Sequence, residues 1–414
     1  MESVTLGEIF RDEWGRLLAR LVAQFRRLDL AEDGLSDAFL AATTCWPADG
    51  MPGNPAGWLL TTARRKILDR LRGEATAARK EPLLTVDAQL QQQAQRVMAD
   101  VGKELGDERL RLMFLCAHPA LAPDAAAALT LRLVVGVATA DIAAVFHTTE
   151  PTMAARLTRA KRTVARSGGH FVVPAGAELA PRLATVCRIV YLAFTTAYAP
   201  ARGSEVTRAA VAGEAVRLGR LLMALRPEPP EARALLALML LQHSRRDART
   251  DATGRLVLLP DQDRSRWSAD EIGEGLALLE PMLSGSWSGL AAEYFLQALI
   301  AAEHVVAPHA EDTRWDRIAG HYTELEALTG SPVVRLNRAV AVAETEGPAA
   351  GLALLDGLDA ALSRSHRLAG ARAALLADLG QVEAARQAYA SALRLCRNDL
   401  EAEHLRGRLA ALAR

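Results

Sequence analysis

The stretch TADIAAVFHTTEPTMAARLTRAKRTVAR, residues 139–166, decides the fold of the first part of this 414-residue chain. It predicts a short helix over residues 140–146, a four-residue turn and a second helix that begins at Pro151. Proline fits the first turn of a helix because its missing N–H would have no partner there, and Thr149 or Glu150 can cap the helix. Its buried stripe is predicted from apolar residues at helical spacing: Met153, Leu157, Ala160 and Val164.

The second helix of this pair is strongly basic. Residues 151–168 carry five basic side chains and no acidic one. In a DNA-binding helix-turn-helix, the second helix enters the major groove with its N-terminal residues. Helix pairs of this shape also occur as plain structural units, but the charge favours duplex DNA. The candidate contacts are Thr149, Thr152, Arg156, Arg159, Lys161 and Arg162.

A second basic segment precedes this motif. Residues 55–80 carry seven basic side chains against two acidic ones, and an amphipathic helix is predicted over about 56–71. The stretch before it, WPADGMPGNPAGW at residues 46–58, is so rich in proline and glycine that we expect no helix to continue through it. Trp46 and Trp58 fill a core or, in a sharper interpretation, form an exposed wedge that stacks on bases.

The first 54 residues are acidic instead, with nine acidic and five basic side chains. Their apolar spacing predicts helices over about 6–28 and 31–44. Over the whole chain the 49 basic and 49 acidic residues balance, which excludes a uniformly basic nucleic-acid coat but not local basic patches. Abundant alanine and leucine, with only 5% aromatic residues, favour helix over strand. We therefore expect an all-α protein of several domains.

Cysteine usage and hydropathy argue against other classes of protein. No C-x-x-C pair exists, so neither a zinc ribbon nor a disulfide scaffold is expected. His118 has no further ligand pair nearby, so we expect a core or capping role for it and no metal. No apolar run reaches the ~18 residues of a membrane span, and the first residues lack a secretory signal pattern. We expect a cytoplasmic protein without cofactors.

The order of these segments resembles that of a bacterial RNA polymerase sigma factor of the extracytoplasmic-function (ECF) type. DLAEDGLSDAFLAA, residues 29–42, is similar to the helix that binds the polymerase clamp. NPAGWLLTTARRKILDRLR, residues 54–72, is similar to the helix that melts and reads the −10 promoter element, and the helix-turn-helix to the one that reads the −35 element. There are departures: Gly34 stands where leucine is usual and should weaken its helix by up to about 1 kcal/mol, and His147 replaces the usual glycine of the turn.

The resemblance implies a protein that binds core RNA polymerase and promoter DNA and directs promoter-specific initiation. It implies no catalytic residue, because the polymerase supplies the chemistry. It implies polymerase contacts at Asp29, Glu32, Asp33, Asp37 and Phe39. It implies −10 contacts at Asn54, Trp58, Arg64, Arg65, Lys66, Arg70 and Arg72, and −35 contacts at the six residues of the basic helix. Two alternatives stay open: a stand-alone helix-turn-helix regulator with a ligand- or protein-sensing helical-repeat domain, and an enzyme or adaptor on a helical-repeat scaffold.

The chain also resembles one ECF subgroup, on the stretches at residues 114–136, 258–267 and 331–355, and the members of this subgroup carry a long helical C-terminal extension. Two glycine-led segments begin 33 residues apart, at Gly347 and Gly380. In the second, small and aromatic residues match the offsets of a tetratricopeptide helix: Ala385, Tyr389 and Ala392. Generic antiparallel helix packing is the alternative.

The expected domains follow from these motifs. They are sigma region two at 1–80, a linker at 81–105, sigma region four at 106–170, a helical extension at 171–290 and tetratricopeptide-like repeats at 291–414. Within the extension, one loop sets carboxylates beside arginines without a histidine or cysteine nearby, which disfavours catalysis against an ion-pair network or an interface. Its candidate interface residues, for the sigma domains or another protein, are Asp261, Asp263, Arg264, Arg266 and Trp267.

Overall fold

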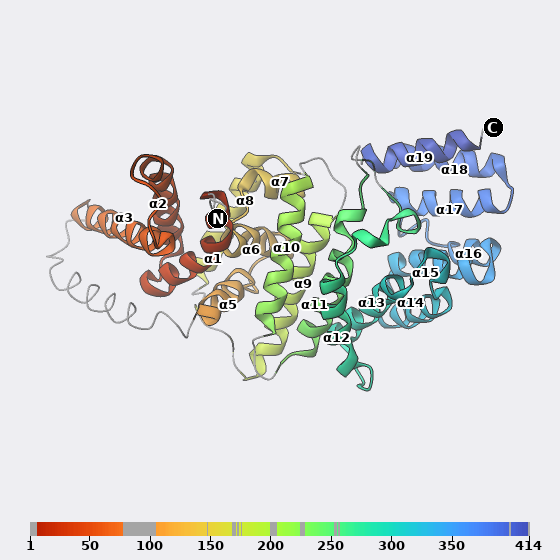
Figure 1. Cartoon of the computed structure of the whole chain (residues 1–414), viewed down its shortest axis with the longest axis horizontal. Helices are drawn as coiled ribbons and strands as arrows, with labels where there is room; N and C mark the ends of the chain where they lie inside the picture. Colours follow the sequence, from red (N-terminus) through yellow and green to blue (C-terminus); the bar gives the residue numbers. More distant parts are fainter. Residues whose placement is uncertain are drawn as a thin grey trace. The chain divides into compact units, whose positions relative to one another are not determined.

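The structure is a computed structural model that describes residues 6–77, 105–146, 148–167, 171, 174, 176–198, 205–223, 228–251, 255, 257–396 and 399–412. Every regular element within these residues is a helix, which confirms the expected all-α fold (Figure 1). None of these helices is both long and apolar enough to cross a membrane. The chain divides into two compact units, Met1–Thr196 and Ala197–Arg414, and each is described by itself.

The N-terminal unit begins with three helices that pack on one another: α1 (Leu6–Phe25), α2 (Leu28–Asp49) and α3 (Pro55–Ala77). Their shared core is apolar, and Leu18, Leu35 and Ile67 are fully buried in it. α3 is amphipathic, as the sequence predicts, because Leu60 and Ile67 are buried in this core while Arg65 and Arg72 are exposed.

The expectation that no helix runs through residues 46–58 is wrong for the first residues of this stretch. α2 continues through Pro47 and ends at Asp49. A proline in the last turn removes only one backbone hydrogen bond, and the buried Trp46 holds this turn against the core. Gly50, with φ of 82°, then ends the helix, and its N–H donates to the carbonyl oxygen of Trp46. The interruption is therefore confined to residues 50–54.

The rest of the N-terminal unit consists of helices and short turns. They are α5 (Leu105–Cys116), α6 (Pro123–Thr130), a π-helical turn η1 (Leu131–Val135), α7 (Thr139–Val145), α8 (Glu150–Arg166), a short 3₁₀ turn η2 (Gly176–Glu178) and α9 (Leu179–Tyr198). The helix-turn-helix is formed by α7 and α8. η1 ends at Gly136, whose φ of 87° needs a residue without a side chain. α7 and α8 pack together as the sequence predicts. His147, which replaces the usual glycine of the turn, lies outside the described residues.

The C-terminal unit is a succession of helices joined by 3₁₀ turns. Its first helices are α10 (Glu205–Leu222), α11 (Pro230–His243), α12 (Ala269–Leu279), α13 (Gly289–Val306) and α14 (Trp315–Thr329). The 3₁₀ turns are η3 (Arg246–Ala248), η4 (Leu259–Asp261), η5 (Arg264–Arg266), η6 (Glu280–Met282) and η7 (Ala310–Asp312). The completely buried stretch of α11, residues 234–241, packs against α10, α12 and α13 and forms the centre of this unit.

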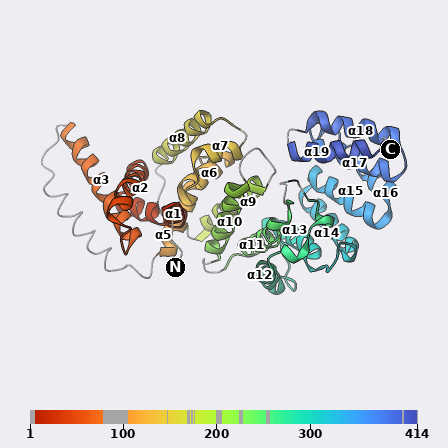
Figure 2. The same ribbon diagram turned by 45° about the horizontal axis from the view of Figure 1, so that its top comes forward.

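The last five helices are α15 (Pro332–Glu346), α16 (Pro348–Leu354), α17 (His366–Asp378), α18 (Val382–Leu395) and α19 (Asp399–Ala411). Each packs on the next, and α17, α18 and α19 lie side by side in both views (Figures 1 and 2). Gly347 and Gly380, the glycines that lead the two predicted repeats, both have a positive φ, 93° and 73°. The small and aromatic positions of the second repeat are buried as predicted: Ala385, Tyr389 and Ala392.

Candidate promoter and polymerase interfaces

Helix α8, the second helix of the helix-turn-helix, has one apolar face and one cationic face. The predicted stripe of Met153, Leu157, Ala160 and Val164 is the buried face of the helix. Thr149 is the N-cap, and its hydroxyl oxygen accepts a hydrogen bond from the N–H of Thr152 at 3.4 Å. The side chains of Thr152, Arg159 and Arg162 are exposed, and that of Arg156 is half-buried. The face of α8 opposite the buried stripe therefore carries exposed hydroxyl and guanidinium groups.

Lys161, the remaining candidate on α8, is held by an acidic partner. Its Nζ lies 2.8 Å from Oε2 of Glu32 on α2, and Nε of Arg132 lies 3.1 Å from the other oxygen, Oε1. Glu32 is only 6% exposed. A buried carboxylate of this kind requires a cationic partner, but the sequence did not show that the partners lie 100 and 129 residues away.

The same two parts of the chain meet in a close packing contact beside this ion cluster. Trp14 is buried on α1 and donates from Nε1 to the carbonyl oxygen of Arg132 at 3.1 Å. The guanidinium carbon of Arg132 lies 5.3 Å from the centre of the indole ring. A Cβ on Gly15 would lie 1.9 Å from the carbonyl oxygen of Val134, and one on Gly136 would lie 2.8 Å from the indole of Trp14. We call this contact of α1 and α2 with η1 and α8 the seam.

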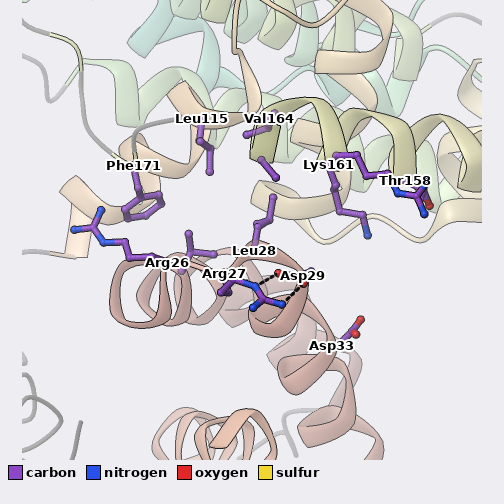
Figure 3. A pocket seen from close by; sticks show the side chains of 13 residues that line it. Arg26, Arg27, Leu28, Asp29, Asp33, Leu115, Thr158, Lys161, Val164 and Phe171 are labelled. Atoms are coloured by element: carbon purple, nitrogen blue, oxygen red, sulfur yellow. Dashed lines mark hydrogen bonds and ion pairs between the residues drawn. The ribbon is translucent and has the colours of Figure 1, made fainter. Parts of the chain in front are cut away.

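Next to the seam, a cavity of about 810 Å³ opens between the turn joining α1 to α2 and the helix α8 (Figure 3). Its apolar lining includes Leu28 and Val164, and its cations include Arg26 and Arg162. Arg26 has φ of 54°, which places a non-glycine residue in the left-handed region. The cavity means that solvent reaches this side of the seam, between a mainly apolar lining and the charged side chains beside it.

The expected polymerase contacts on α2 are not equally accessible. Asp33 has an exposed side chain and pairs with Arg70 at 3.2 Å, which also pairs with Asp37 at 2.9 Å. Asp29 accepts two hydrogen bonds from Arg27, and these bonds hold the pKa of its carboxyl below the usual range. Phe39 is buried against the rings of Phe10 and Trp14. Phe39 is thus a core residue here, and Asp29, Asp33 and Asp37 form the accessible acidic surface.

The expected −10 residues form a capped helix start followed by a basic face on α3. Oδ1 of Asn54 accepts a hydrogen bond from the N–H of Gly57 at 2.9 Å. The rings of Trp46 and Trp58 are 5.5 Å apart in an edge-to-face arrangement. Trp46 is buried, so it fills the core and is no exposed wedge, whereas Trp58 is half-buried.

Some of the basic side chains of α3 are paired with other side chains of the protein, and others are exposed. Nε of Arg64 donates to Oε1 of Gln24 at 2.8 Å, and burial followed by the charge of Arg20 lowers the pKa of Arg64. Arg70 is paired with the α2 carboxylates, and Arg72 with Asp69 at 3.2 Å. The side chains of Arg65 and Lys66 are exposed.

Several side chains of the loop at residues 261–267 make contacts within the C-terminal unit itself. Nη1 of Arg264 donates to the carbonyl oxygens of His304 and Ala307, each at 2.7 Å, at the C-terminal end of α13. Its guanidinium also lies 4.5 Å from the ring centre of Trp267, which is buried. Asp263 caps the short helix η5 through Ser265. Asp261, Asp263 and Arg266 remain exposed for any partner.

One group of side chains in the described part of the chain has ligand atoms close enough for a metal ion. His366, Cys396 and Glu401 place theirs within 4.8 Å of one another. Nε2 of His366 already bonds Oε2 of Glu401 at 2.5 Å, and Arg367 lies 3.4 Å from the other oxygen. This hydrogen bond and the nearby cation satisfy the carboxylate without a metal. The group joins the ends of three helices, α17, α18 and α19.

Comparison with known families matches three parts of the chain. Sigma-70 region 2 matches residues 10–76, Sigma-70 region 4 matches residues 111–164, and a family of unknown function (DUF6596) matches residues 182–283. The chain is an ECF-type sigma factor with a C-terminal extension. Such a sigma factor directs promoter-specific initiation, and its two sigma domains imply binding of core RNA polymerase and promoter DNA. The families that match the two sigma domains consist of non-enzymatic, DNA-binding initiation factors.

The sigma factor is also similar to one protein along nearly its whole length. An uncharacterized protein of Rhizobium meliloti (strain 1021) is 41% identical over 399 residues, which cover 96% of this chain and 93% of that protein. No solved structure matches the chain significantly. The similarity therefore extends through the C-terminal unit and links the extension to the sigma domains in a second protein.

Proposed function

We propose that α8 of this sigma factor reads the −35 element with Thr149, Thr152, Arg156, Arg159, Lys161 and Arg162. The observation that carries the proposal is the division of the helix into a buried stripe and a cationic exposed face. Bidentate guanidinium contacts to guanine edges specify sequence, while contacts to phosphates set the register. Arg159 and Arg162, as exposed groups, are the arginines that reach the DNA without rearrangement.

The −10 function belongs to α3 and the loop before it. Asn54 and Trp58 lie at the helix start, where a base extruded from the duplex can enter, and Arg65 and Lys66 are exposed for the strand phosphates. Arg64, Arg70 and Arg72 have protein partners and act by fixing the helix or by exchanging these partners for phosphates. Extruding a base costs a few kcal/mol, so a stacking or pocket contact must offset it.

The acidic surface of α2 binds the polymerase clamp through Asp29, Asp33 and Asp37, and through Glu32 once its partners release it. Phe39 supports the helix from the core. The C-terminal unit is a docking part that sigma activity requires, and its exposed Asp261, Asp263 and Arg266 are its contact candidates. The finer division into region two, linker, region four, helical extension and repeats belongs to the same proposal.

Run-off transcription tests the function as a whole. Purified chain and core polymerase are combined on a promoter library from the source genome, and we expect transcripts from a small set that share −35 and −10 elements. A footprint by the chain alone, with no effect of polymerase, would instead support a stand-alone regulator. Transcription that ignores promoter sequence would refute both.

A further inference from the structure

The seam joins a residue assigned to polymerase binding with a residue assigned to DNA binding. Glu32 lies on the acidic helix α2, and Lys161 lies on the recognition helix α8. Their charged atoms are 2.8 Å apart, and Arg132 holds the second carboxylate oxygen. While this cluster is formed, a basic surface of another protein cannot reach Glu32, and a phosphate cannot take Lys161.

The seam is built into the backbone as well as into side chains. At Gly15 any side chain would overlap the carbonyl oxygen of Val134, and at Gly136 it would overlap Trp14. Glycine inside a helix costs about 0.5–1 kcal/mol relative to alanine, yet Gly15 lies in the middle of α1. The close approach of α1 to η1 accounts for this glycine, since α1 by itself would be more stable with alanine.

The ion cluster of the seam is partly exposed on the side of its two cations. The side chains of Arg132 and Lys161 keep 21% and 29% of their exposure, while that of Glu32 keeps 8%. The cavity of about 810 Å³ lies beside this cluster and is lined by α8 residues and by the α1–α2 turn. Water therefore reaches the cluster at Lys161, which lines the cavity, and release of Lys161 and Arg132 would uncover Glu32 for another cation.

We propose that the seam is a resting contact of this sigma factor, in which α8 and η1 occupy the acidic helix α2 until a basic surface of core polymerase displaces them. The inference rests on the proposed role of α2 in polymerase binding. Polymerase binding then frees Glu32, and the same event frees Lys161 for the −35 DNA. The seam thereby couples the two events and keeps the free protein from binding promoter DNA unproductively.

A zero-length crosslink measures the seam directly. A carbodiimide joins a carboxylate to a primary amine only when they touch, and the chain has just four lysines. We expect mass spectrometry of the full-length free protein to find the Glu32–Lys161 isopeptide, and saturating core polymerase to abolish it. Lys161→Arg keeps the positive charge but offers no amine, so this variant is the chemical control.

A glycine pair tests the function of the seam. Gly15→Ala inserts a methyl group against Val134, while Gly320→Ala places one in open space in the middle of α14. We expect Gly15→Ala to reduce the crosslink and to raise the affinity for core polymerase about fivefold or more, and Gly320→Ala to change neither. If Gly15→Ala does not fold by circular dichroism, Arg132→Ala takes its place, since it removes one partner of Glu32 and the packing over Trp14 without adding atoms to the contact.

The outcomes separate the two proposals. No crosslink in the free protein, or unchanged polymerase affinity in a folded seam variant, would overturn the resting contact. A crosslink that persists in the saturated polymerase complex would overturn it as well, because polymerase would then bind without opening the seam. Failure of the wild-type chain to bind polymerase would refute the proposed function of α2 instead.

Discussion

At the scale of single residues, the tertiary structure explains why glycine stands at position 34 of a helix. In the sequence it reads as a weak point of the polymerase-binding helix. In the structure, a Cβ at this position would lie 2.5 Å from Cγ1 of Ile67 and 3.1 Å from the carbonyl oxygen of Ala63. Gly34 therefore allows α2 and α3 to approach closely.

Gly34→Ala should destabilise the N-terminal unit in spite of the better helix propensity of alanine. Overpacking of a close contact costs about 1–3 kcal/mol, which exceeds the gain of about 1 kcal/mol in propensity. Urea unfolding followed by circular dichroism measures the change. Gly73→Ala on α3, where nothing lies within 4 Å, is the matched control and should be neutral or stabilising.

The recognition residues make a second prediction at this scale. Arg156→Ala and Arg159→Ala should each lower −35-dependent transcription, and loss of a guanine contact should cost about 1–3 kcal/mol of discrimination. A phosphate contact would weaken all promoters alike, so the assay compares native and mutated −35 elements. Core polymerase binding should be unchanged. Wild-type strength and selectivity in both variants would contradict the assignment.

At the scale of elements, the start of α3 combines a structural and a functional role in Asn54. Its side chain caps the helix through Gly57 at 2.9 Å, and loss of such a cap costs about 1 kcal/mol. A defect of Asn54→Ala alone therefore does not distinguish capping from contact with a base.

Asn54→Ala should slow promoter opening more than closed-complex formation, and Asn54→Asp resolves the cause. Aspartate keeps the cap but replaces the amide donor and adds a negative charge near the strand. We expect Asn54→Asp to preserve helix stability and still to slow opening, as measured by permanganate reactivity of unpaired thymines. Normal reactivity in Asn54→Asp would reduce the role of Asn54 to capping.

The C-terminal end of α13 makes a prediction about pH. Burial, with the nearby charges of Arg245 and Arg264, lowers the pKa of His304 from 6.5 to about 4. The ring packs edge-to-face on Trp315, with the ring centres 5.3 Å apart. Between these two pKa values the unfolded chain binds a proton that the folded chain does not.

Stability from His304 should therefore be fully present above pH 6.5 and should be lost as the pH falls towards 4, by up to about 3 kcal/mol. Thermal unfolding between pH 7 and 4.5 measures this slope. His304→Gln removes the titrating group, so its slope should be shallower over the same interval. An identical slope in the two proteins would contradict the shifted pKa.

At the scale of the whole molecule, the N-terminal unit extends beyond the sigma motifs. It ends at Thr196, within α9, rather than near residue 170. Nη2 of Arg182 on α9 bonds the carbonyl oxygen of Phe114 on α5 at 2.5 Å. A truncation after Gly169 consequently removes a helix that packs with the sigma domains in the N-terminal unit, although most of α9 lies in the part that matches DUF6596.

Truncation of the extension should abolish promoter-dependent transcription if the extension is required. Chains that end at Gly169 and at Tyr198, the last residue of α9, should both lose activity in run-off assays, while only the shorter chain should also lose thermal stability. Full activity of the chain ending at Tyr198 would show that the extension is dispensable, and higher activity would show that it inhibits. Asp261→Ala with Arg266→Ala then tests the exposed loop, because Arg264 is needed to hold α13.

The sequence by itself determined the features that depend on local periodicity and on the order of motifs. The stripe of α8 from Met153 to Val164, its threonine cap and the buried positions of the last repeat follow from helical spacing. The order of acidic helix, basic helix and helix-turn-helix identified the sigma family. These features can be predicted from the sequence because the period of a helix determines which of its residues share a face.

Only the tertiary structure decided which faces meet and which charges are already occupied. It paired Glu32 with Lys161, moved Phe39 and Trp46 into the core and placed Arg264 on the carbonyls at the end of α13. It also explained Gly15 and Gly34 as sites of close backbone approach. The physical reason is that an ion pair or a steric overlap depends on distances between segments far apart in the chain, which periodicity does not encode.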